Sequence, residues 1–193
     1  MNRMTLIVLV TEVVLAVVGL VVGRWIGTPI LEDARVDLRS GVLALAATIP
    51  LVAFVFWGMR TEMAFLARLR ELVRETIVPL FASCSPLEIL LVSIMAGIGE
   101  EVFFRGFLQG SLARVVNPWI ALALVSVLFG LVHYVSLAYA IMAGLIGLYL
   151  GTLLLVTGNL FVAIAVHALY DFAVLLLISR MTLSPATEPE VYQ

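Results

Sequence analysis

The sequence predicts an all-α membrane protein, folded as a single polytopic bundle of about six transmembrane helices with one further amphipathic helix at the membrane surface. Hydrophobic residues make up 63% of the 193 residues, charged residues make up 12%, and the mean hydropathy is +1.18. Soluble domains carry about 45–50% apolar and about 25% charged residues, so the bilayer is the expected solvent. The apolar residues fall into segments near the ~20 residues that cross a membrane as a helix, without the alternation of a barrel strand.

The first predicted span covers residues 4–26, and the second covers residues 41–58. The apolar run from Thr5 to Val22 is longer than the h-region of a signal peptide, about 7–15 residues, and lacks a small-residue cleavage site. We therefore expect a retained first span. The connection over residues 24–40 carries charges of both signs, which predicts a solvated loop.

Residues 60–79 predict an amphipathic helix that lies in the membrane interface. Arginines and large apolar residues alternate there at spacings that give a helix one cationic and one apolar face. The cationic face carries Arg60, Arg68, Arg70 and Arg74, and the apolar face carries Phe65, Leu66, Leu69, Leu72 and Val73.

Helix-capping and turn signals separate the remaining spans. Ser85 followed by Pro86 is typical of a helix N-terminus, and Asn117-Pro118 and Gly158-Asn159 predict turns. The proline-rich and glutamate-rich residues 181–193 predict a disordered tail. The four further spans cover residues 87–113, 118–136, 138–156 and 159–179, and residues 1–193 form one membrane domain.

The charged residues bear on topology and on partners. All 11 basic residues are arginines, the net charge is −2, and no polybasic stripe is present, so nucleic acid is not an expected partner. The lone Cys84 predicts neither a disulfide nor a metal pair. Six arginines fall on the side of the two termini and four on the other, which predicts both termini in the cytosol. The expected location is the cell membrane, with a bacterial inner membrane as the specific prediction.

Three charges occur within six residues of the third predicted span, at Glu100, Glu101 and Arg105. Each charge at the bilayer centre costs about 2.5–3.5 kcal/mol on insertion scales, so the cluster points to function. On a helix Arg105 lies about 40° from Glu101 and about 140° from Glu100, which predicts a Glu101–Arg105 ion pair. An alternative is that all three charges only hold helices together.

Glu100 has no local partner on its helix, which makes it the first candidate for a general base in a dry site. Both histidines of the chain, His133 and His167, also fall inside predicted spans. Counted from the turn near Val116, Glu100 and His133 are both about 24–25 Å deep, so antiparallel helices would bring them together.

His167 fits this arrangement less well. Straight helices leave it about 10 Å from the level of Glu100, so a tilt or a glycine kink is needed to bring it close. Asp171 follows at i+4 and shares the same helix face, either orienting the imidazole or adding a polar group to the cavity. A purely structural His-Asp pair is the alternative.

The three clusters resemble the motifs of the CAAX protease and bacteriocin-processing enzyme family, also called the Abi family, which includes the CAAX prenyl proteases of the Ras-converting type. Glu100-Glu101-x-x-x-Arg105, Phe129-x-x-x-His133 and His167-x-x-x-Asp171 occur in the family's order. The resemblance covers residues 85–180, the expected catalytic core.

The resemblance implies an intramembrane peptidase in which Glu100 and His133 activate a water. His167 and Asp171 would stabilise the oxyanion or orient the site, and Glu101 with Arg105 would support it. The prenyl-protease type has Asn where this chain has Asp171, and an ionised aspartate would repel an oxyanion. Asp171 is therefore expected to stay protonated or to act through His167.

The expected partners are the lipid bilayer and a peptide or protein substrate within or at the membrane. Members of the family have been labelled metalloproteases, and a Glu/His/His set is able to hold a divalent ion such as zinc. The chain has no H-E-x-x-H motif, so a metal-free glutamate peptidase without a cofactor is the favoured prediction. The alternatives are a non-catalytic relative, acting as an immunity factor or membrane scaffold, and a transporter or channel, which the lack of an internal repeat disfavours.

Overall fold

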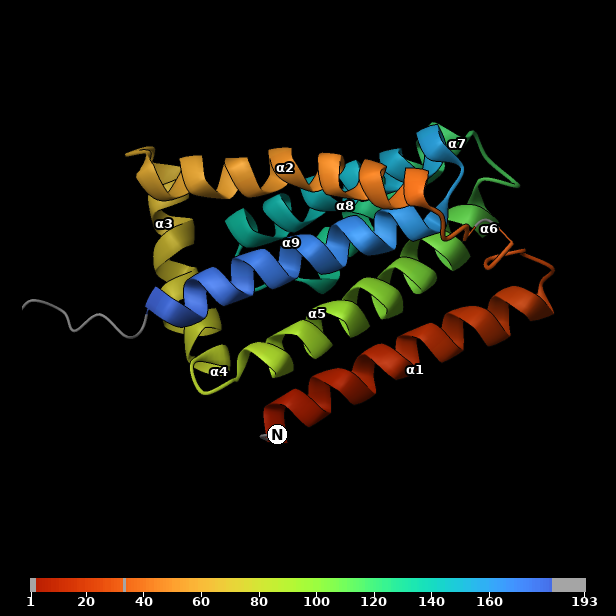
Figure 1. The fold of residues 1–193 in the computed structure, drawn as a ribbon. Helices are drawn as coiled ribbons and strands as arrows, with labels where there is room; N and C mark the ends of the chain where they lie inside the picture. The colour runs from red at the N-terminus through yellow and green to blue at the C-terminus, as the bar shows by residue number, and fades with distance from the viewer. Residues whose placement is uncertain (1–2, 33, 182–193) are drawn as a thin grey trace, which may run out of the picture.

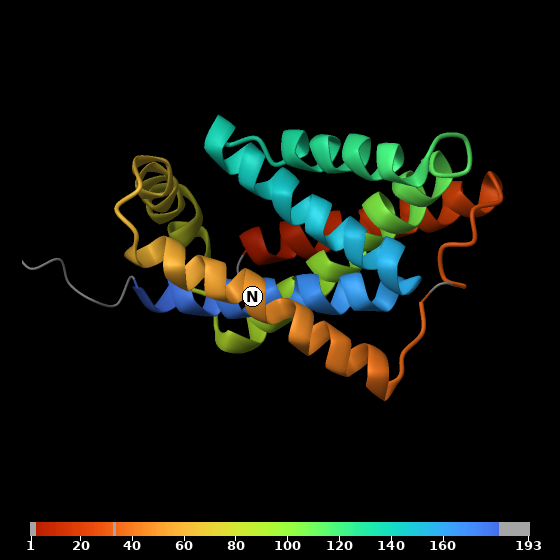
Figure 2. The same ribbon diagram turned by 90° about the horizontal axis from the view of Figure 1, so that it is seen from above.

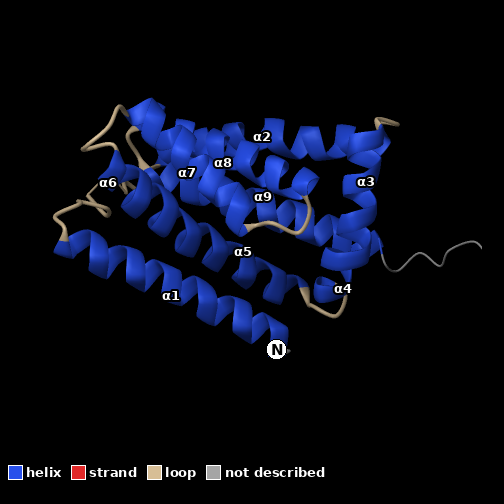
Figure 3. Ribbon diagram, turned by 180° about the vertical axis from the view of Figure 1, so that it is seen from behind, coloured by secondary structure: helices blue, strands red, loops and turns tan. Residues whose placement is uncertain are grey.

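The computed structural model describes residues 3–32 and 34–181, and every regular element in these two ranges is helical, which confirms the all-α prediction (Figure 3). Of the tail predicted for residues 181–193, only Met181 belongs to the described residues, as the end of the last helix. In chain order the elements are α1 (Arg3–Trp25), α2 (Leu38–Arg60), α3 (Ala64–Leu72), η1 (Val73–Ile77), α4 (Val78–Phe81), α5 (Pro86–Glu100), η2 (Glu101–Gln109), α6 (Gly110–Leu112), α7 (Pro118–Val132), α8 (Leu137–Thr157) and α9 (Leu160–Met181).

Each of the six predicted apolar segments is mainly helical, but the helices differ in length. Segments Thr5–Trp25, Leu38–Arg60, Leu137–Thr157 and Leu160–Arg180 are each long and apolar enough to cross a membrane. A fifth candidate is a bent pair, in which Ala64–Phe81 meets Pro86–Leu112 at 110°. The apolar helix α7 is shorter, at 15 residues. The predicted multi-span bundle is therefore confirmed in outline.

Helix α9 lies at the centre of the bundle and packs against α5, α2 and α8 (Figure 1). Helix α1 packs against α5 and η2 at the edge of the bundle, and α7 pairs with α8 (Figure 2). A peripheral position leaves most of α1 open to lipid, in line with its many exposed valines and leucines. The core therefore forms around α5, η2 and α9.

The amphipathic segment runs across one end of the bundle, nearly perpendicular to the long helices, as expected for a helix lying in the membrane plane (Figure 1). Leu66 on its apolar face is buried. The guanidinium of Arg70 donates hydrogen bonds to the carbonyl oxygens of Gly58 and, at 2.9 Å, Thr61, which join the segment to the end of α2.

The predicted boundaries at Ser85, Asn117 and Gly158 are confirmed. Ser85 forms a capping box with Glu88, Asn117 accepts a hydrogen bond from the Trp119 N–H at 2.9 Å, and Gly158 ends α8 with a left-handed φ of 58°. These local signals fix where α5, α7 and α8 begin or end.

The loop before α2 is tied to the turn between α8 and α9. The Arg35 N–H donates to the Asn159 side chain at 2.9 Å, and the Asn159 amide donates to the Ser40 hydroxyl at 2.7 Å. Asp37 caps α2 by accepting from the Ser40 N–H, a hydrogen bond that lowers the pKa of this aspartate. These contacts hold residues 35–40 against the turn between α8 and α9.

The structure corrects the fourth predicted span, which was expected over residues 118–136. Helix α7 ends at Val132, and His133 is the residue that caps it. The His133 ring Nδ1 lies 2.8 Å from the Phe129 carbonyl oxygen, which a backbone N–H would bind in a continuing helix. A helix of this length spans about 22 Å, less than the ~30 Å hydrocarbon core. His133 is therefore expected at membrane depth.

Candidate active site

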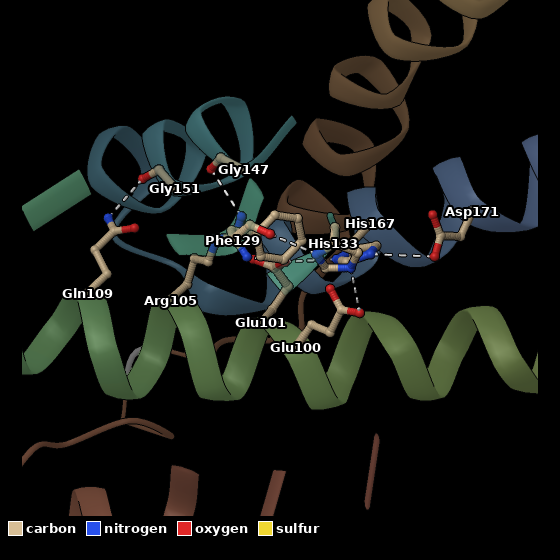
Figure 4. A network of polar contacts seen from close by, with 10 residues as sticks. All are labelled: Glu100, Glu101, Arg105, Gln109, Phe129, His133, Gly147, Gly151, His167 and Asp171. Carbon is tan, nitrogen blue, oxygen red and sulfur yellow. Dashed lines mark hydrogen bonds and ion pairs between the residues drawn. The ribbon is translucent and has the colours of Figure 1, made fainter. Parts of the chain in front are cut away.

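The third span changes its helix type where the charged residues begin. Residues Pro86–Glu100 form an α-helix, and Glu101–Gln109 continue the same rod as a π-helix, in which hydrogen bonds join residues i and i+5. The sequence pattern predicted an uninterrupted α-helix here. The wider turn places Glu101, Arg105 and Gln109 toward α8 (Figure 4).

Glu101 and Arg105 form the predicted ion pair inside the protein. The Arg105 Nη1 lies 3.0 Å from Glu101 Oε1, and the two side chains are 1% and 0% exposed. Arg105 also donates to the Gly147 carbonyl oxygen of α8 at 3.1 Å, and its guanidinium stacks 4.2 Å from the centre of the Phe129 ring. A buried arginine thus has a carboxylate, a carbonyl and an aromatic face as partners.

His167 lies between two carboxylates. Its Nδ1 is 2.8 Å from Glu101 Oε1, and its Nε2 is 3.4 Å from Asp171 Oδ2 on the next turn of α9. Since a carboxylate oxygen accepts hydrogen bonds, this arrangement suits an imidazole that carries a proton on both nitrogens. The expected gap of about 10 Å between His167 and the other site residues is therefore closed in the structure.

Glu100 and His133 face each other across α5 and the end of α7. His133 Nε2 lies 3.5 Å from Glu100 Oε1, with the side chains 29% and 12% exposed, so the predicted match of depths is confirmed. Because the Phe129 carbonyl only accepts, the His133 Nδ1 carries a proton and Nε2 is directed at Glu100. Within the described part of the chain, Glu100 Oε2 is buried and has no hydrogen-bond partner.

A second side chain joins η2 to α8 and was not singled out by the sequence analysis. The Gln109 amide donates to the Gly151 carbonyl oxygen at 3.2 Å, one helical turn from the Arg105–Gly147 contact (Figure 4). A Cβ at Gly151 would lie 2.5 Å from Gln109 Oε1. The signal in the sequence is the shared spacing of four residues in Arg105–Gln109 and Gly147–Gly151.

Glu12 of α1 is another site neighbour that the sequence analysis missed. Its side chain is buried, and it lies within electrostatic reach of Glu100, His133, His167 and Asp171. The helix α1 approaches α5 closely beside it, since a Cβ at Gly99 would lie 2.7 Å from Glu12 Oε2. A charge within an otherwise apolar span was the signal that would have found it.

Comparison with known families assigns the central part of the chain. A model of the family described as type II CAAX prenyl endopeptidase Rce1-like matches residues 82–173. Over these residues the chain is similar to the Rce1-like family. Comparisons with the curated proteins and with the solved structures found no match.

All six residues that the sequence analysis selected lie within the Rce1-like region, and the structure brings them into one network (Figure 4). This match supports a CAAX-protease-like peptidase in a multi-pass membrane protein. The individual catalytic roles stay predictions. Glu12 lies outside the matched residues.

The side chains of the Rce1-like site do not form a ready-made metal centre. Over residues 3–32 and 34–181, no three His, Cys, Asp or Glu side chains are grouped to hold one ion. The reason is that both nitrogens of His167 face carboxylates and the Nδ1 of His133 is bound to a carbonyl. Metal dependence stays a prediction for experiment.

Proposed function

We propose that the protein is an intramembrane endopeptidase in which Glu100 and His133 activate a water for hydrolysis of a peptide bond. The observation that carries the proposal is the pairing of Glu100 Oε1 with His133 Nε2 at 3.5 Å, beside a Glu100 Oε2 that no described protein atom binds. A carboxylate oxygen without a protein partner has its hydrogen-bonding capacity left for a water. The shortness of α7, at 15 residues, supports a position of this pair at membrane depth.

In the proposed reaction, Glu100 removes a proton from the water, and the oxygen attacks the carbonyl carbon of the substrate peptide. The carbonyl oxygen gains the negative charge of the tetrahedral intermediate. When the C–N bond breaks, the proton held by Glu100 passes to the leaving amine. His133 orients the water. It also holds the Glu100 carboxyl group in place while this group takes up and returns the proton.

His167 supplies a donor for the oxyanion. Its Nε2 lies 3.4 Å from Asp171, which is long for a hydrogen bond. The Nε2–H can therefore donate a hydrogen bond to a substrate oxygen instead. Glu101, held by Arg105, fixes the opposite nitrogen and so the position of the ring. Asp171 acts through His167 in this scheme, which avoids placing an anion against the oxyanion.

The family description names a prenylated CAAX substrate, which makes a membrane-anchored peptide with an accessible C-terminal segment the first substrate class to test. The connection between α7 and α8 lies toward the bundle end that carries the amphipathic segment (Figure 2).

The test compares membrane peptides by mass spectrometry for wild type and Glu100→Gln in the same proteoliposomes. We expect Glu100→Gln to fold and to cleave about 10²–10⁴-fold more slowly, because the amide keeps the shape and loses the base. Glu88→Gln is the matched control, since it makes the same change in the first turn of α5 and keeps a residue able to form the capping box.

Adding His133→Ala to Glu100→Gln should lower the cleavage rate little further, since both residues serve one water.

Full cleavage by folded Glu100→Gln would exclude Glu100 from the mechanism and favour a non-catalytic scaffold or immunity role.

Elemental analysis of the purified protein, with cleavage measured before and after chelation, tests the metal-free prediction. A metal-free peptidase is expected to contain less than stoichiometric metal and to keep its activity in chelator. A stoichiometric ion whose removal abolishes cleavage would replace the proposed scheme with a metal-bound water held by the same residues.

A further inference from the structure

Every charged group of the site except one acid lies next to a group of opposite charge. Arg105 faces Glu101, His167 faces Asp171 as well as Glu101, and His133 faces Glu100. Each basic side chain of the network therefore has an acidic partner already. Glu12 is the remaining acid, and the described residues contain no hydrogen-bond donor for its buried Oε2.

An unpaired carboxylate at this depth is unfavourable, because the low-dielectric interior offers neither water nor a counter-ion. The acids Glu100 and Asp171, which are within electrostatic reach of Glu12, add repulsion to an ionised form, whereas His133 and His167 already face other carboxylates. Glu12 is 7% exposed, so solvent does little to relieve the cost. The neutral acid is the form that this environment accepts.

A neutral carboxylic acid carries an O–H that needs an acceptor. The described residues provide no acceptor for Glu12 Oε2. This oxygen nevertheless lies close to α5, the helix that ends at Glu100. A Cβ at Gly99, the residue before Glu100, would lie 2.5 Å from the Glu12 carbonyl oxygen and 2.7 Å from Oε2. A side chain at residue 99 would thus push α1 away, and glycine is what permits this close approach.

We propose that Glu12 is a substrate-binding residue of the active site, a neutral acid whose O–H donates a hydrogen bond to the carbonyl oxygen of the scissile peptide. The inference rests on the proposed peptidase function and deepens it. It gives α1, which lies outside the matched residues 82–173, a part in the reaction. Beside the Nε2–H of His167, Glu12 supplies a second donor to the oxygen where charge develops.

Two variants separate hydrogen-bond donation from other roles. Glu12→Leu removes the donor and should lower kcat/KM about 10²–10³-fold, the usual effect of losing one oxyanion donor. Glu12→Gln keeps an N–H donor of similar shape and should stay within about tenfold of wild type. Thr11→Leu is the matched control, because Thr11 is exposed and hydrogen-bonds only its own helix, through the Ile7 carbonyl. This control should cleave like wild type.

Infrared difference spectroscopy provides a readout that does not depend on cleavage. The spectrum of wild type minus Glu12→Gln at neutral pH should contain the C=O stretch of a protonated carboxylic acid, whereas an ionised Glu12 would give none. The measurement uses Glu12→Gln and so remains available if Glu12→Leu fails to fold.

Three results would overturn the inference alone: Glu12→Leu cleaving at the wild-type rate while Glu100→Gln does not, Glu12→Gln being as slow as Glu12→Leu, or a difference spectrum without the acid band. A wild-type protein that cleaves no membrane peptide would overturn the peptidase proposal and this inference together.

Discussion

At the scale of single residues, one carboxylate organises the site. Glu101 Oε1 contacts both Arg105 and His167, and the Arg105 guanidinium reaches the Phe129 ring and the Gly147 carbonyl oxygen. Four helical elements, η2, α7, α8 and α9, therefore meet at one buried ion pair. Since a buried charge is tolerated only with its partners in place, the network favours one arrangement of these elements.

Arg105→Ala should leave Glu101 as an uncompensated buried acid and remove the bond to α8. We expect a loss of about 3–5 kcal/mol in the free energy of unfolding, together with lower folded yield. The measurement is denaturant or thermal unfolding in detergent micelles.

Arg114→Ala is the matched control for this prediction. Arg114 is exposed and donates to loop carbonyls such as that of Gly27 at 2.9 Å, so its removal should cost about 1 kcal/mol or less. Equal stability of the Arg105 and Arg114 variants would contradict the central position of the Glu101–Arg105 pair.

At the scale of elements, glycines set how closely the helices approach. A Cβ at Gly130 on α7 would lie 2.5 Å from the Ala140 carbonyl oxygen of α8, and one at Gly97 on α5 would lie 2.8 Å from the Ile164 carbonyl oxygen of α9. Small residues at such crossings let membrane helices gain van der Waals contact between their backbones. Gly130 lies three residues before His133, so this contact also positions the end of α7.

Gly130→Ala should force α7 and α8 apart and cost about 1–3 kcal/mol in the free energy of unfolding, since backbone atoms leave no room for the methyl group. Cleavage should fall as well, because His133 moves with the helix. Gly41→Ala in α2 provides the control: a Cβ there meets nothing within 4 Å, and the change should leave stability the same or raise it by up to about 1 kcal/mol. A Gly130→Ala protein as stable as Gly41→Ala would refute the close-packed interface.

At the scale of the whole molecule, the connections sort to two ends of the bundle. The start of α1, the amphipathic segment and the end of α9 lie at one end, and the connecting residues 26–32, 34–37 and 113–117 lie at the other (Figures 1 and 2). An even number of passes places the two ends of the helical region on the same side of the membrane. The arginine excess predicts that this side is the cytosol.

Cysteine accessibility labelling tests this topology. After Cys84→Ser, single cysteines at Glu62 and Arg180 should react from one side of the membrane, and single cysteines at Val36 and Val115 from the other. The two valines are 77% and 78% exposed, so poor access within the protein will not hide them. Labelling of Glu62→Cys and Arg180→Cys from opposite sides would contradict an even number of spans between these two positions.

The sequence by itself determined the features that depend on neighbouring residues. Apolar run lengths predicted the helices, capping residues such as Ser85 and Gly158 predicted their ends, and the spacing of four residues predicted the Glu101–Arg105 pair. The regular rise of a helix also predicted the meeting of Glu100 with His133, because both lie at equal distances from one turn. Three motifs in order predicted the family that matches residues 82–173.

Only the tertiary structure decided the features that depend on packing between distant segments. The π-helical turn of η2, the end of α7 at His133 and the reach of His167 to Glu101 follow from how α8 and α9 fit against the third span. Glu12 lies beside the site because Gly99 allows α1 to approach α5 closely. This contact joins residues that are far apart in the chain. Helix periodicity gives each residue a depth and a face, whereas the choice of neighbouring helix depends on side-chain volumes and buried polar partners summed over the whole bundle.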